Sequence, residues 1–353
     1  MSWPRLQEAS TQGGNPLDSP ATPRFYRQAD ADPTALDGCT VAVLGYGNLG
    51  RSVALNLRDS GVSVVVGNRD DEYAAAATAD GFRVEAVAEA TAAGDVAFAL
   101  LPDEVLPEAF AEIGPRLRSG GMLALASGYN LAYGLIDPPA ACDVCLLAPR
   151  MVGSQVRELF QAGGGYFAYV NVEHDASGKA WPRLLALASA IGALRHGAFQ
   201  LSARDEAALD LFIEQAVGTQ IGSAFQLAFQ VGVEAGIPPE ALVLEMYMSG
   251  EMARSVQAFA EQGFYRSVVD HGRTAQFGGF IRTIEMDRPA AEDRTRRIFD
   301  EIVSGDFARR FQAEKEAGYP TIRIIDGVLS GNDPQSQAED RVRALLDQPG
   351  AEQ

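Results

Sequence analysis

The chain has 353 residues, a length that favours two domains. Hydrophobic residues make up 47% and charged residues 22%, a composition typical of soluble globular proteins. Its formal net charge of −18 disfavours nucleic acid and membrane surfaces as partners. Three cysteines, the lack of a signal-peptide pattern and the lack of a long apolar run favour a cytoplasmic location.

Four segments are expected along the chain. Residues 1–36 are rich in Pro, Gly, Ala, Asp and Gln without a period, which predicts a flexible N-terminal arm. Residues 37–200 alternate short apolar runs with helical stretches, which is typical of a Rossmann-type α/β domain whose parallel sheet is covered on both faces. Helical periodicity over residues 201–329 predicts an all-α domain, and residues 330–353 form a polar tail.

A glycine motif follows the first predicted strand directly. Gly45, Gly47 and Gly50 form GxGxxG between that strand and a predicted helix. In a strand–turn–helix context this spacing lets the backbone approach a pyrophosphate at the helix N-terminus. We expect the turn, with Tyr46 and Asn48, to bind a dinucleotide; the alternative is a glycine-rich turn without a ligand.

The residues after the second strand are expected to contact the adenosine ribose. A carboxylate there accepts from the ribose hydroxyls and repels a 2′-phosphate, so Asp70, Asp71 and Glu72 favour NADH. Arg69 favours the phosphate of NADPH, because a guanidinium pairs well with phosphate. The three acids shift the expectation towards NADH, with helix capping as the alternative role for any of them.

Two later apolar runs carry further candidates. Leu101 and Pro102, at the end of the run 95–102, are expected to contact the cofactor. Cys142 and Cys145 form a CxxC within the apolar run 141–149. A redox CxxC normally opens a helix and zinc needs further ligands, so buried packing is the favoured role.

From residue 38 to residue 326 the sequence resembles the ketol-acid reductoisomerases. The matching stretches include "VAVLGYGNLGRSVALNLRDSGVSVVVG", "ALLPDEV", "LDLFIEQAV" and "IVSGDFARRFQAEKEAGYP". The resemblance implies an N-terminal Rossmann domain and a knotted, dimer-forming helical domain, in a homodimer or higher homo-oligomer. It also implies an alkyl shift on a 2-hydroxy-2-alkyl-3-keto acid with two Mg²⁺ ions, followed by reduction of the 2-keto acid with NADH or NADPH.

The resemblance assigns metal ligands to the helical domain. Asp210 and Glu214 match the family's metal-binding pair, and their i, i+4 spacing puts both carboxylates on one helix face, where hard oxygen ligands suit Mg²⁺. Glu251 matches the second glutamate of the pair that the partner subunit donates, and Tyr247 stands where the first is expected. Glu245 is an alternative ligand, although it lies six residues before Glu251. Solvent-facing acids are the alternative to ligands.

The departures from the family fall in the substrate site. Ser127 stands in place of an active-site histidine, and Arg150 in place of a lysine. Gly272 stands in place of the serine that grips the substrate carboxylate, and the adjacent Arg273 is a candidate to bind that carboxylate instead; a surface salt bridge is the alternative for both arginines. His271 adjoins this segment and is a weaker candidate.

Three functions remain open from sequence. The favoured one is an NAD(P)H-dependent, Mg²⁺-assisted reductase of a 2-keto acid or related small carbonyl compound, with a weak or lost isomerase step. The second is a genuine ketol-acid reductoisomerase of branched-chain amino acid biosynthesis. The third is a non-catalytic nucleotide-binding subunit.

Overall fold

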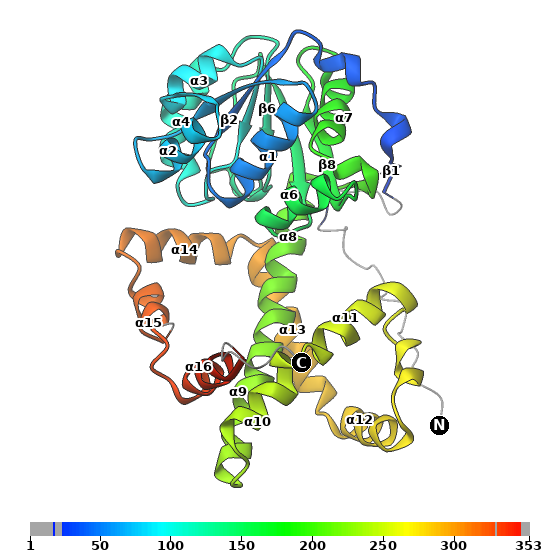
Figure 1. The fold of residues 1–353 in the computed structure, drawn as a ribbon. Helices are drawn as coiled ribbons and strands as arrows, with labels where there is room; N and C mark the ends of the chain where they lie inside the picture. Colours follow the sequence, from blue (N-terminus) through cyan, green and yellow to red (C-terminus); the bar gives the residue numbers. More distant parts are fainter. Residues whose placement is uncertain (1–16, 18–22, 329, 347–353) are drawn as a thin grey trace. The chain divides into compact units, whose positions relative to one another are not determined.

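The computed structural model describes residues 17, 23–328 and 330–346, and the chain divides into two compact units, residues 1–210 and 211–353 (Figure 1). The division between the units falls after residue 210, whereas the boundary expected from sequence lies after residue 200. Helix α8 (Ala203–Ile213) follows the last strand, and its first two turns bury Ala203, Asp205, Glu206, Ala207 and Ala208. These turns therefore belong to the first unit.

The first unit contains a nine-stranded sheet with the order β1-β9-β8-β7-β6-β5-β2-β3-β4. The strands are β1 (Phe25–Tyr26), β2 (Thr40–Leu44), β3 (Ser63–Gly67), β4 (Arg83–Glu85), β5 (Val96–Ala99), β6 (Met122–Leu125), β7 (Asp143–Pro149), β8 (Phe167–His174) and β9 (Gly197–Gln200). The strands from β4 to β7 in this order are parallel to their neighbours. This confirms the Rossmann-type α/β class.

The sheet is not parallel throughout. Strand β8 runs antiparallel to β7, β9 runs parallel to β8, and β1 runs antiparallel to β9. The apolar pattern did not reveal this reversal, because a strand buried inside a sheet is hydrophobic whichever way it runs.

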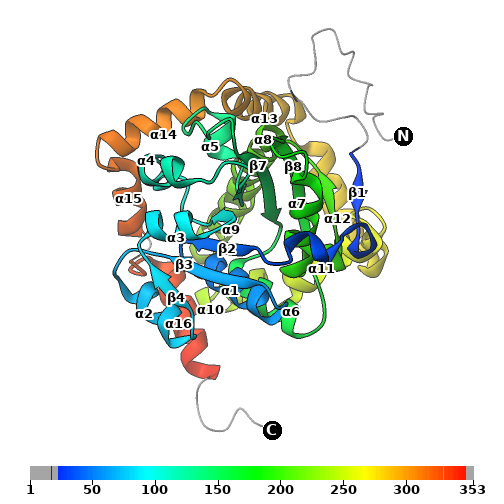
Figure 2. The same ribbon diagram turned by 90° about the horizontal axis from the view of Figure 1, so that it is seen from above.

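Helices cover both faces of the sheet (Figure 2). Alternate strand residues point to opposite faces, so that Val41 and Val43 lie in one core layer and Ala42 and Leu44 in the other. The first layer packs against α1 (Asn48–Asp59), α2 (Glu72–Ala79), α6 (Gly153–Gln161) and α7 (Ala180–Ala190). The second packs against α3 (Val87–Ala93), α4 (Leu106–Ile113) and α5 (Tyr129–Ala132).

The two cysteines of the CxxC are packing residues. Cys142 belongs to the second core layer and Cys145 to the first, so the two thiols lie in different layers of the core. Both are buried, and burial raises the pKa of the Cys142 thiol to about 11. The expectation of buried packing is confirmed.

The ordered fold begins before residue 37, which corrects the expected extent of the flexible arm. Strand β1 pairs with β9, and short 3₁₀ turns follow at Gln28–Asp30 and Pro33–Leu36. Tyr26 and Leu36 are buried, at 4% and 6% exposure. Two apolar side chains are enough to attach this polar segment to the core. Residues 1–16 and 18–22 of the expected arm lie outside the described residues.

The second unit is helical, as expected. A π-helical turn at Glu214–Gly218 leads from α8 into α9 (Thr219–Glu234), and a second π-helical turn covers Leu244–Met248. The other α-helices are α10 (Pro239–Val243), α11 (Glu251–Gln262), α12 (Arg273–Glu285), α13 (Arg288–Val303), α14 (Asp306–Glu316), α15 (Pro320–Val328) and α16 (Pro334–Leu346). A 3₁₀ turn lies at Ser267–Asp270.

The expected polar tail contains helix α16. Ala338 and Val342 on α16 are buried against Phe229 of α9 and Val243 of α10. These two apolar residues, spaced i, i+4, lie on the docked face of an otherwise polar segment. Residues 347–353 lie outside the described part of the chain.

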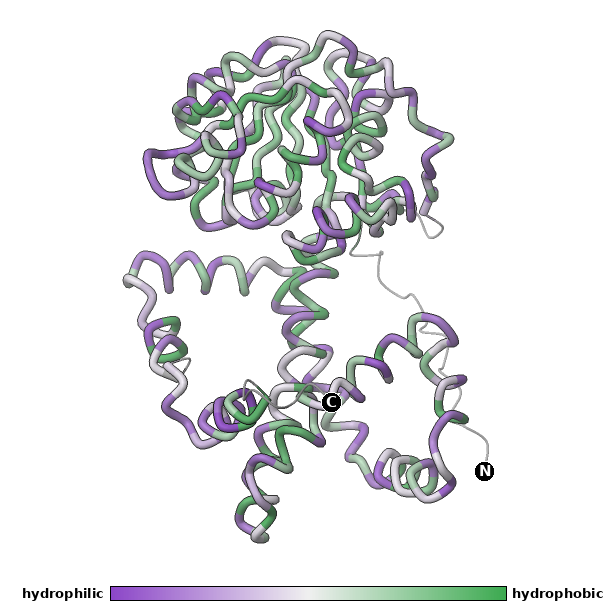
Figure 3. The backbone as a smooth tube through the Cα atoms, in the orientation of Figure 1, coloured by the Kyte–Doolittle hydropathy of each residue, from purple (hydrophilic) through white to green (hydrophobic). Residues whose placement is uncertain are grey.

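The two units differ in how they bury hydrophobic residues. In the first unit the hydrophobic residues concentrate in the strands between the helices (Figure 3). In the second unit many large hydrophobic side chains are exposed on the helices, among them Leu227, Val231, Phe277 and Ile324. No helix in the described residues is long and apolar enough to cross a membrane.

Candidate active site

The glycine turn is built around one left-handed residue and two close approaches. Gly45 has φ +98°, a conformation that favours glycine, and an added Cβ would lie 2.8 Å from the carbonyl oxygen of Leu100. At Gly50 a Cβ would lie 2.0 Å from the carbonyl oxygen of Gly45, so helix α1 packs directly against the turn. Gly45 and Gly50 are therefore required by the fold itself.

Gly47 differs from the other two glycines. It is the N-cap residue of α1, with φ −69°, and no atom lies within 4 Å of a built Cβ. No side-chain cap occupies the α1 N-terminus in the described chain. The space beside Gly47 is therefore open, and an anion placed there would be stabilised by the helix dipole.

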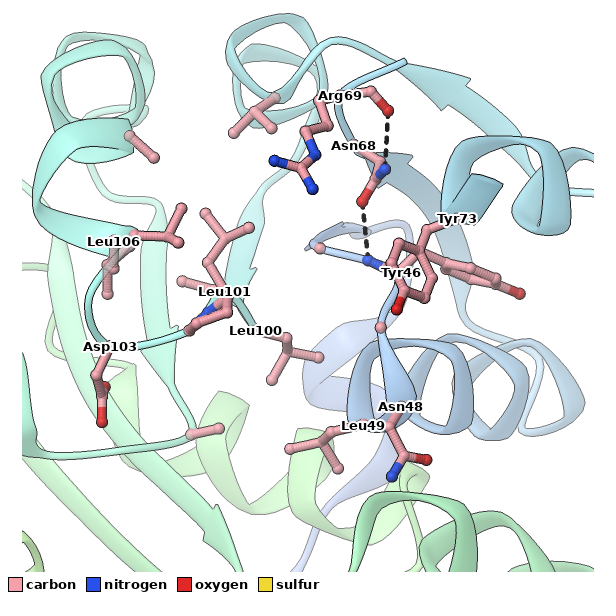
Figure 4. Close-up of a pocket in the computed structure, with 18 of the residues that line it drawn as sticks. Tyr46, Asn48, Leu49, Asn68, Arg69, Tyr73, Leu100, Leu101, Asp103 and Leu106 are labelled. Carbon is pink, nitrogen blue, oxygen red and sulfur yellow. Dashed lines mark hydrogen bonds between the residues drawn. The ribbon is translucent and has the colours of Figure 1, made fainter. Parts of the chain in front are cut away.

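This space is a cavity of about 630 Å³ at the carboxyl ends of β2, β3, β5 and β6 (Figure 4). Eight predicted cofactor residues line it: Gly45, Tyr46, Gly47, Asn48, Arg69, Asp71, Leu101 and Pro102. Gly50 and Asp70 do not line it. A cavity of this size, at the switch of strand order between β2 and β5, fits a dinucleotide.

The turn is held in place by Tyr46 and Asn68. The Tyr46 N–H donates to Asn68 Oδ1 at 3.1 Å, as Figure 4 shows, and the Tyr46 hydroxyl donates to Asp80 Oδ2 at 2.8 Å. Arg51 pairs with the same Asp80 carboxylate at 2.7 Å. The Tyr46 ring is buried against Phe82. Asn68 and Asp80 were not selected from sequence, because their contacts with Tyr46 arise only when the turn after β3 and the end of α2 meet the glycine turn.

Asp71 caps a helix, which was the alternative role for the acids of this loop. Its Oδ1 accepts from the Tyr73 and Ala74 N–H groups at 3.0 and 3.2 Å, and from Asn68 Nδ2 at 2.8 Å. Its Oδ2 accepts from Arg69 Nε at 2.6 Å. These donors, Arg69 foremost, hold the pKa of Asp71 below its ordinary value. The Arg69 side chain is 82% exposed and lies at the cavity.

A second group of polar side chains lies where β5, β6 and β7 end. The loop after β5 carries Asp103, the loop after β6 carries Ser127, and Arg150 follows β7. The Arg150 guanidinium donates to Glu206 Oε1 at 3.0 Å and to Asp210 Oδ1, and lies over the Tyr169 ring. Glu206 and Asp210 project from α8 one turn apart.

Glu206 connects this group to the loop of Ser127. Its Oε2 accepts from the Gly128 N–H at 2.7 Å. Gly128 itself packs so closely on α8 that a Cβ would lie 1.9 Å from the Ala203 carbonyl oxygen. Glu206 is 2% exposed, and burial raises its pKa to about 7. Glu206 was not a candidate from sequence, although it precedes Asp210 by four residues on the same helix.

Of the predicted metal ligands, Asp210 forms an ion pair with Arg150. Glu214 is the first residue of the π-helical turn in the second unit. Glu251 is exposed as the first residue of α11, after Gly250 with φ +81°. Tyr247 is bound to α16, because its hydroxyl donates to Glu339 Oε1 at 2.6 Å and accepts from Gln335 Nε2 at 2.8 Å. No three His, Cys, Asp or Glu side chains gather as a metal site within the described ranges.

The predicted carboxylate-binding segment opens helix α12. Gly272 is the N-cap residue, and Arg273 begins the helix. Arg273 is exposed, and its guanidinium contacts Gln276 Oε1 at 3.4 Å. His271 is exposed too, and its carbonyl oxygen accepts from Gln276 Nε2 at 2.6 Å. A guanidinium at a helix N-terminus is chemically suited to a carboxylate.

Both parts of the sequence match family models. The model "Acetohydroxy acid isomeroreductase, NADPH-binding domain" matches residues 35–197, and "Ketol-acid reductoisomerase, C-terminal domain" matches residues 204–348. "Putative ketol-acid reductoisomerase 3" of Saccharolobus solfataricus is 40% identical over 82% of this chain and 89% of its own length. "Ketol-acid reductoisomerase (NADP(+))" of Methanopyrus kandleri is 38% identical over 92% of this chain and 98% of its own length.

The fold leads to the same family. The solved structure of an "NADH-preferring ketol-acid reductoisomerase from an uncultured archean" has a TM-score of 0.87 and 29% identity, covering 92% of this chain and all of the other. A Rossmann-type domain with this glycine turn and cavity, followed by a helical domain, defines an NAD(P)H-dependent oxidoreductase. The chain belongs to the ketol-acid reductoisomerase family, which serves branched-chain amino acid biosynthesis.

Proposed function

We propose that this chain reduces a 2-keto acid with NAD(P)H, assisted by Mg²⁺, and that its alkyl-shift activity is weak or lost. The observation that carries this proposal is the set of hydrogen bonds made by the residues that differ from the family pattern. Tyr247, in a position expected to hold a ligand, has its hydroxyl bound to Glu339 and Gln335 of α16. Ser127, in place of a histidine, is hydrogen-bonded to Asp103. The cavity and glycine turn meanwhile fit the cofactor.

The two steps make different demands on the site. The alkyl shift needs an alkoxide and a neighbouring ketone held together by metal, with a base to deprotonate the alcohol. Each lost contact costs about 2–4 kcal/mol of transition-state stabilisation, so two losses slow the shift by roughly a thousandfold or more. Reduction needs a polarised carbonyl group, a cation for the carboxylate and the hydride that a bound nicotinamide supplies. Arg273 and Arg150 are the candidate cations.

We assign the Mg²⁺ to Asp210 and Glu214, supported by the donor chemistry of two carboxylates on consecutive helical turns. Asp210→Asn should abolish most of the Mg²⁺-dependent turnover and leave the NADH affinity unchanged. NADH oxidation with a 2-keto acid, measured with Mg²⁺ and with EDTA, tests this assignment. Turnover that survives both EDTA and Asp210→Asn would show that these carboxylates only hold Arg150.

We further propose NADH as the preferred cofactor. The ion pair of Arg69 with Asp71 competes with any 2′-phosphate for the guanidinium, and the similar solved structure is titled NADH-preferring. The curated relatives named for NADP(+) make NADPH the competing candidate.

The active form is proposed to be a homodimer or higher homo-oligomer formed by the helical unit. Exposed hydrophobic side chains on α9, α11, α12 and α15 support a second copy as the occupant of these faces. The buried cluster of Phe229, Val243, Ala338 and Val342 is small for a unit of this length. A cytoplasmic location remains part of the proposal, in keeping with the thiols of Cys142 and Cys145.

A full ketol-acid reductoisomerase of branched-chain amino acid biosynthesis is the second candidate. The names of relatives 38–40% identical over most of their length favour it. Turnover of acetolactate compared with turnover of the keto acid that its isomerisation yields separates the two candidates.

A further inference from the structure

A partly buried carboxyl group, not among the candidates from sequence, lies next to Ser127. Asp103, in the loop after β5, accepts from Ser127 Oγ on Oδ2 at 3.1 Å. Asn130 Nδ2 donates to Asp103 Oδ1 and to its carbonyl oxygen, both at 3.2 Å. Asp103 and Ser127 both line the cavity at the glycine turn. The carboxyl group thus touches the cavity edge and is fixed from two sides.

The surroundings raise the pKa of this carboxyl group towards neutral pH. Burial raises the pKa of Asp103 to about 6, and the hydrogen bonds from Ser127 and Asn130 offset part of that effect. The charges of Glu104 and Asp210 raise it further, and the buried Glu206 interacts with it as well. A carboxyl group with a pKa near the working pH is suited to donate and accept a proton.

Ser127 can pass that proton towards the cavity. Its Oγ accepts from the Tyr129 N–H at 3.2 Å, which fixes the position of the oxygen. While Asp103 is ionised, the serine hydroxyl donates to the carboxylate. Once Asp103 is protonated, its O–H donates to Ser127 Oγ, and the serine hydrogen is released to donate to an oxygen in the cavity.

We propose that Asp103 is a positioning residue that stores the proton which Ser127 gives to the carbonyl oxygen of the substrate. The inference rests on the proposed reductase function. In the reduction, the C–H bond of the reduced nicotinamide breaks and its hydride forms a C–H bond at the carbonyl carbon. The carbonyl oxygen takes the Ser127 proton, Ser127 takes the Asp103 proton, and Asp103 is left as a carboxylate that solvent reprotonates.

The test is the pH dependence of both directions of the reaction in wild type, Asp103→Asn and Asp103→Glu. Reduction needs the protonated acid, so wild-type kcat should fall as pH rises through about 6, whereas oxidation of the product alcohol should rise. In Asp103→Asn, the fall of kcat for reduction and its rise for oxidation near pH 6 should both disappear, and kcat should decrease about 100-fold. The NADH affinity, measured by calorimetry, should be unchanged. Asp103→Glu, which keeps a carboxyl group, should recover part of the loss. Glu112→Gln, on the exposed face of α4, is the matched control.

A second readout does not depend on turnover. Infrared difference spectra of the protein without cofactor should show a carboxyl band that titrates near pH 6 and is absent in Asp103→Asn. If Asp103→Asn kept the infrared band, or kept the kcat and pH dependence of the wild type, the assignment to Asp103 would be overturned. The proposed function would not be affected by either result. A wild type that reduces no 2-keto acid would remove the proposed function and this proton path together.

Discussion

At the scale of single residues, the carboxylates of the first unit differ because their surroundings differ. Asp71 is surrounded by donors and holds its charge, so it caps α2 and pairs with Arg69. Asp103 is partly buried with fewer donors, and its pKa is raised, so it is protonated more readily. The sequence identified the loop of Asp71 and missed Asp103, because burial between two strand ends is not visible in local spacing.

The first prediction concerns the cofactor and Asp71. Asp71→Asn should still cap α2 through its side-chain oxygen, but it loses the ion pair that holds Arg69. The guanidinium then pairs with a 2′-phosphate, and the ratio of kcat/KM for NADPH over NADH should rise about tenfold, equivalent to about 1.4 kcal/mol. Asp70→Asn, outside the cavity, is the control. An unchanged ratio in Asp71→Asn would show that the ion pair plays no part in cofactor choice.

The second prediction concerns stability and Asp103. Its pKa in the fold, about 6, lies above the ordinary value of 3.8, so the protonated form is the one that the fold favours. The contribution of Asp103 to the free energy of unfolding is therefore greatest below pH 4. About 2–3 kcal/mol of that free energy is lost as pH rises through 6. Asp103→Asn should raise the melting temperature at pH 8 and leave it nearly unchanged at pH 4. A larger stabilisation at pH 4 than at pH 8 would contradict the burial argument.

At the scale of elements, the carboxyl ends of parallel strands bring the site together. Gly45 follows β2, Asp71 lies in the turn after β3, and Asp103 and Ser127 follow β5 and β6. The strand–turn–helix pattern predicted the first of these turns directly, since its glycines have fixed spacing. The order of the strands in the sheet decides which turns become neighbours, and that order is not written in local periodicity. This is why the contact of Asn68 with the glycine turn was missed.

The third prediction concerns the glycine turn. Gly47→Val should leave the fold intact, because no atom lies within 4 Å of a Cβ at this position and its φ of −69° suits a side chain. The added methyl groups occupy the space in front of the α1 N-terminus, so the affinity for NADH should fall roughly 100-fold or more. Calorimetry and circular dichroism measure the two effects. Gly47→Ala should give an intermediate loss; wild-type affinity in both variants would place the pyrophosphate elsewhere.

At the scale of the whole molecule, the two units bury hydrophobic residues to different degrees. The sheet of the first unit is covered on both faces, and the sequence predicted this from its apolar runs. The helical unit was predicted from periodicity, but its docked helix α16 was not, because Ala338 and Val342 are its only buried apolar residues and its other contacts are polar. The proposed second copy of the chain would cover the many exposed apolar side chains of this unit.

The fourth prediction therefore concerns assembly. Leu227 and Val231 are 62% and 61% exposed and lie one turn apart on α9. Leu227→Asp combined with Val231→Asp should shift the protein from dimer or higher oligomer to monomer, because buried charges oppose association. Gln226→Asp adds a charge at an exposed polar position of the same helix and is the control. Equal sedimentation of the double variant and the wild type would contradict this interface.

The most direct test of the account compares acetolactate with the 2-keto acid that its isomerisation yields, each with NADH, NADPH and Mg²⁺. Because we propose that Ser127, Tyr247 and Gly272 weaken the site of the alkyl shift, we predict rapid NAD(P)H oxidation with the pre-isomerised keto acid. Oxidation with acetolactate should be slower by roughly a thousandfold. Equal and rapid turnover of both compounds would contradict the account and show a complete ketol-acid reductoisomerase.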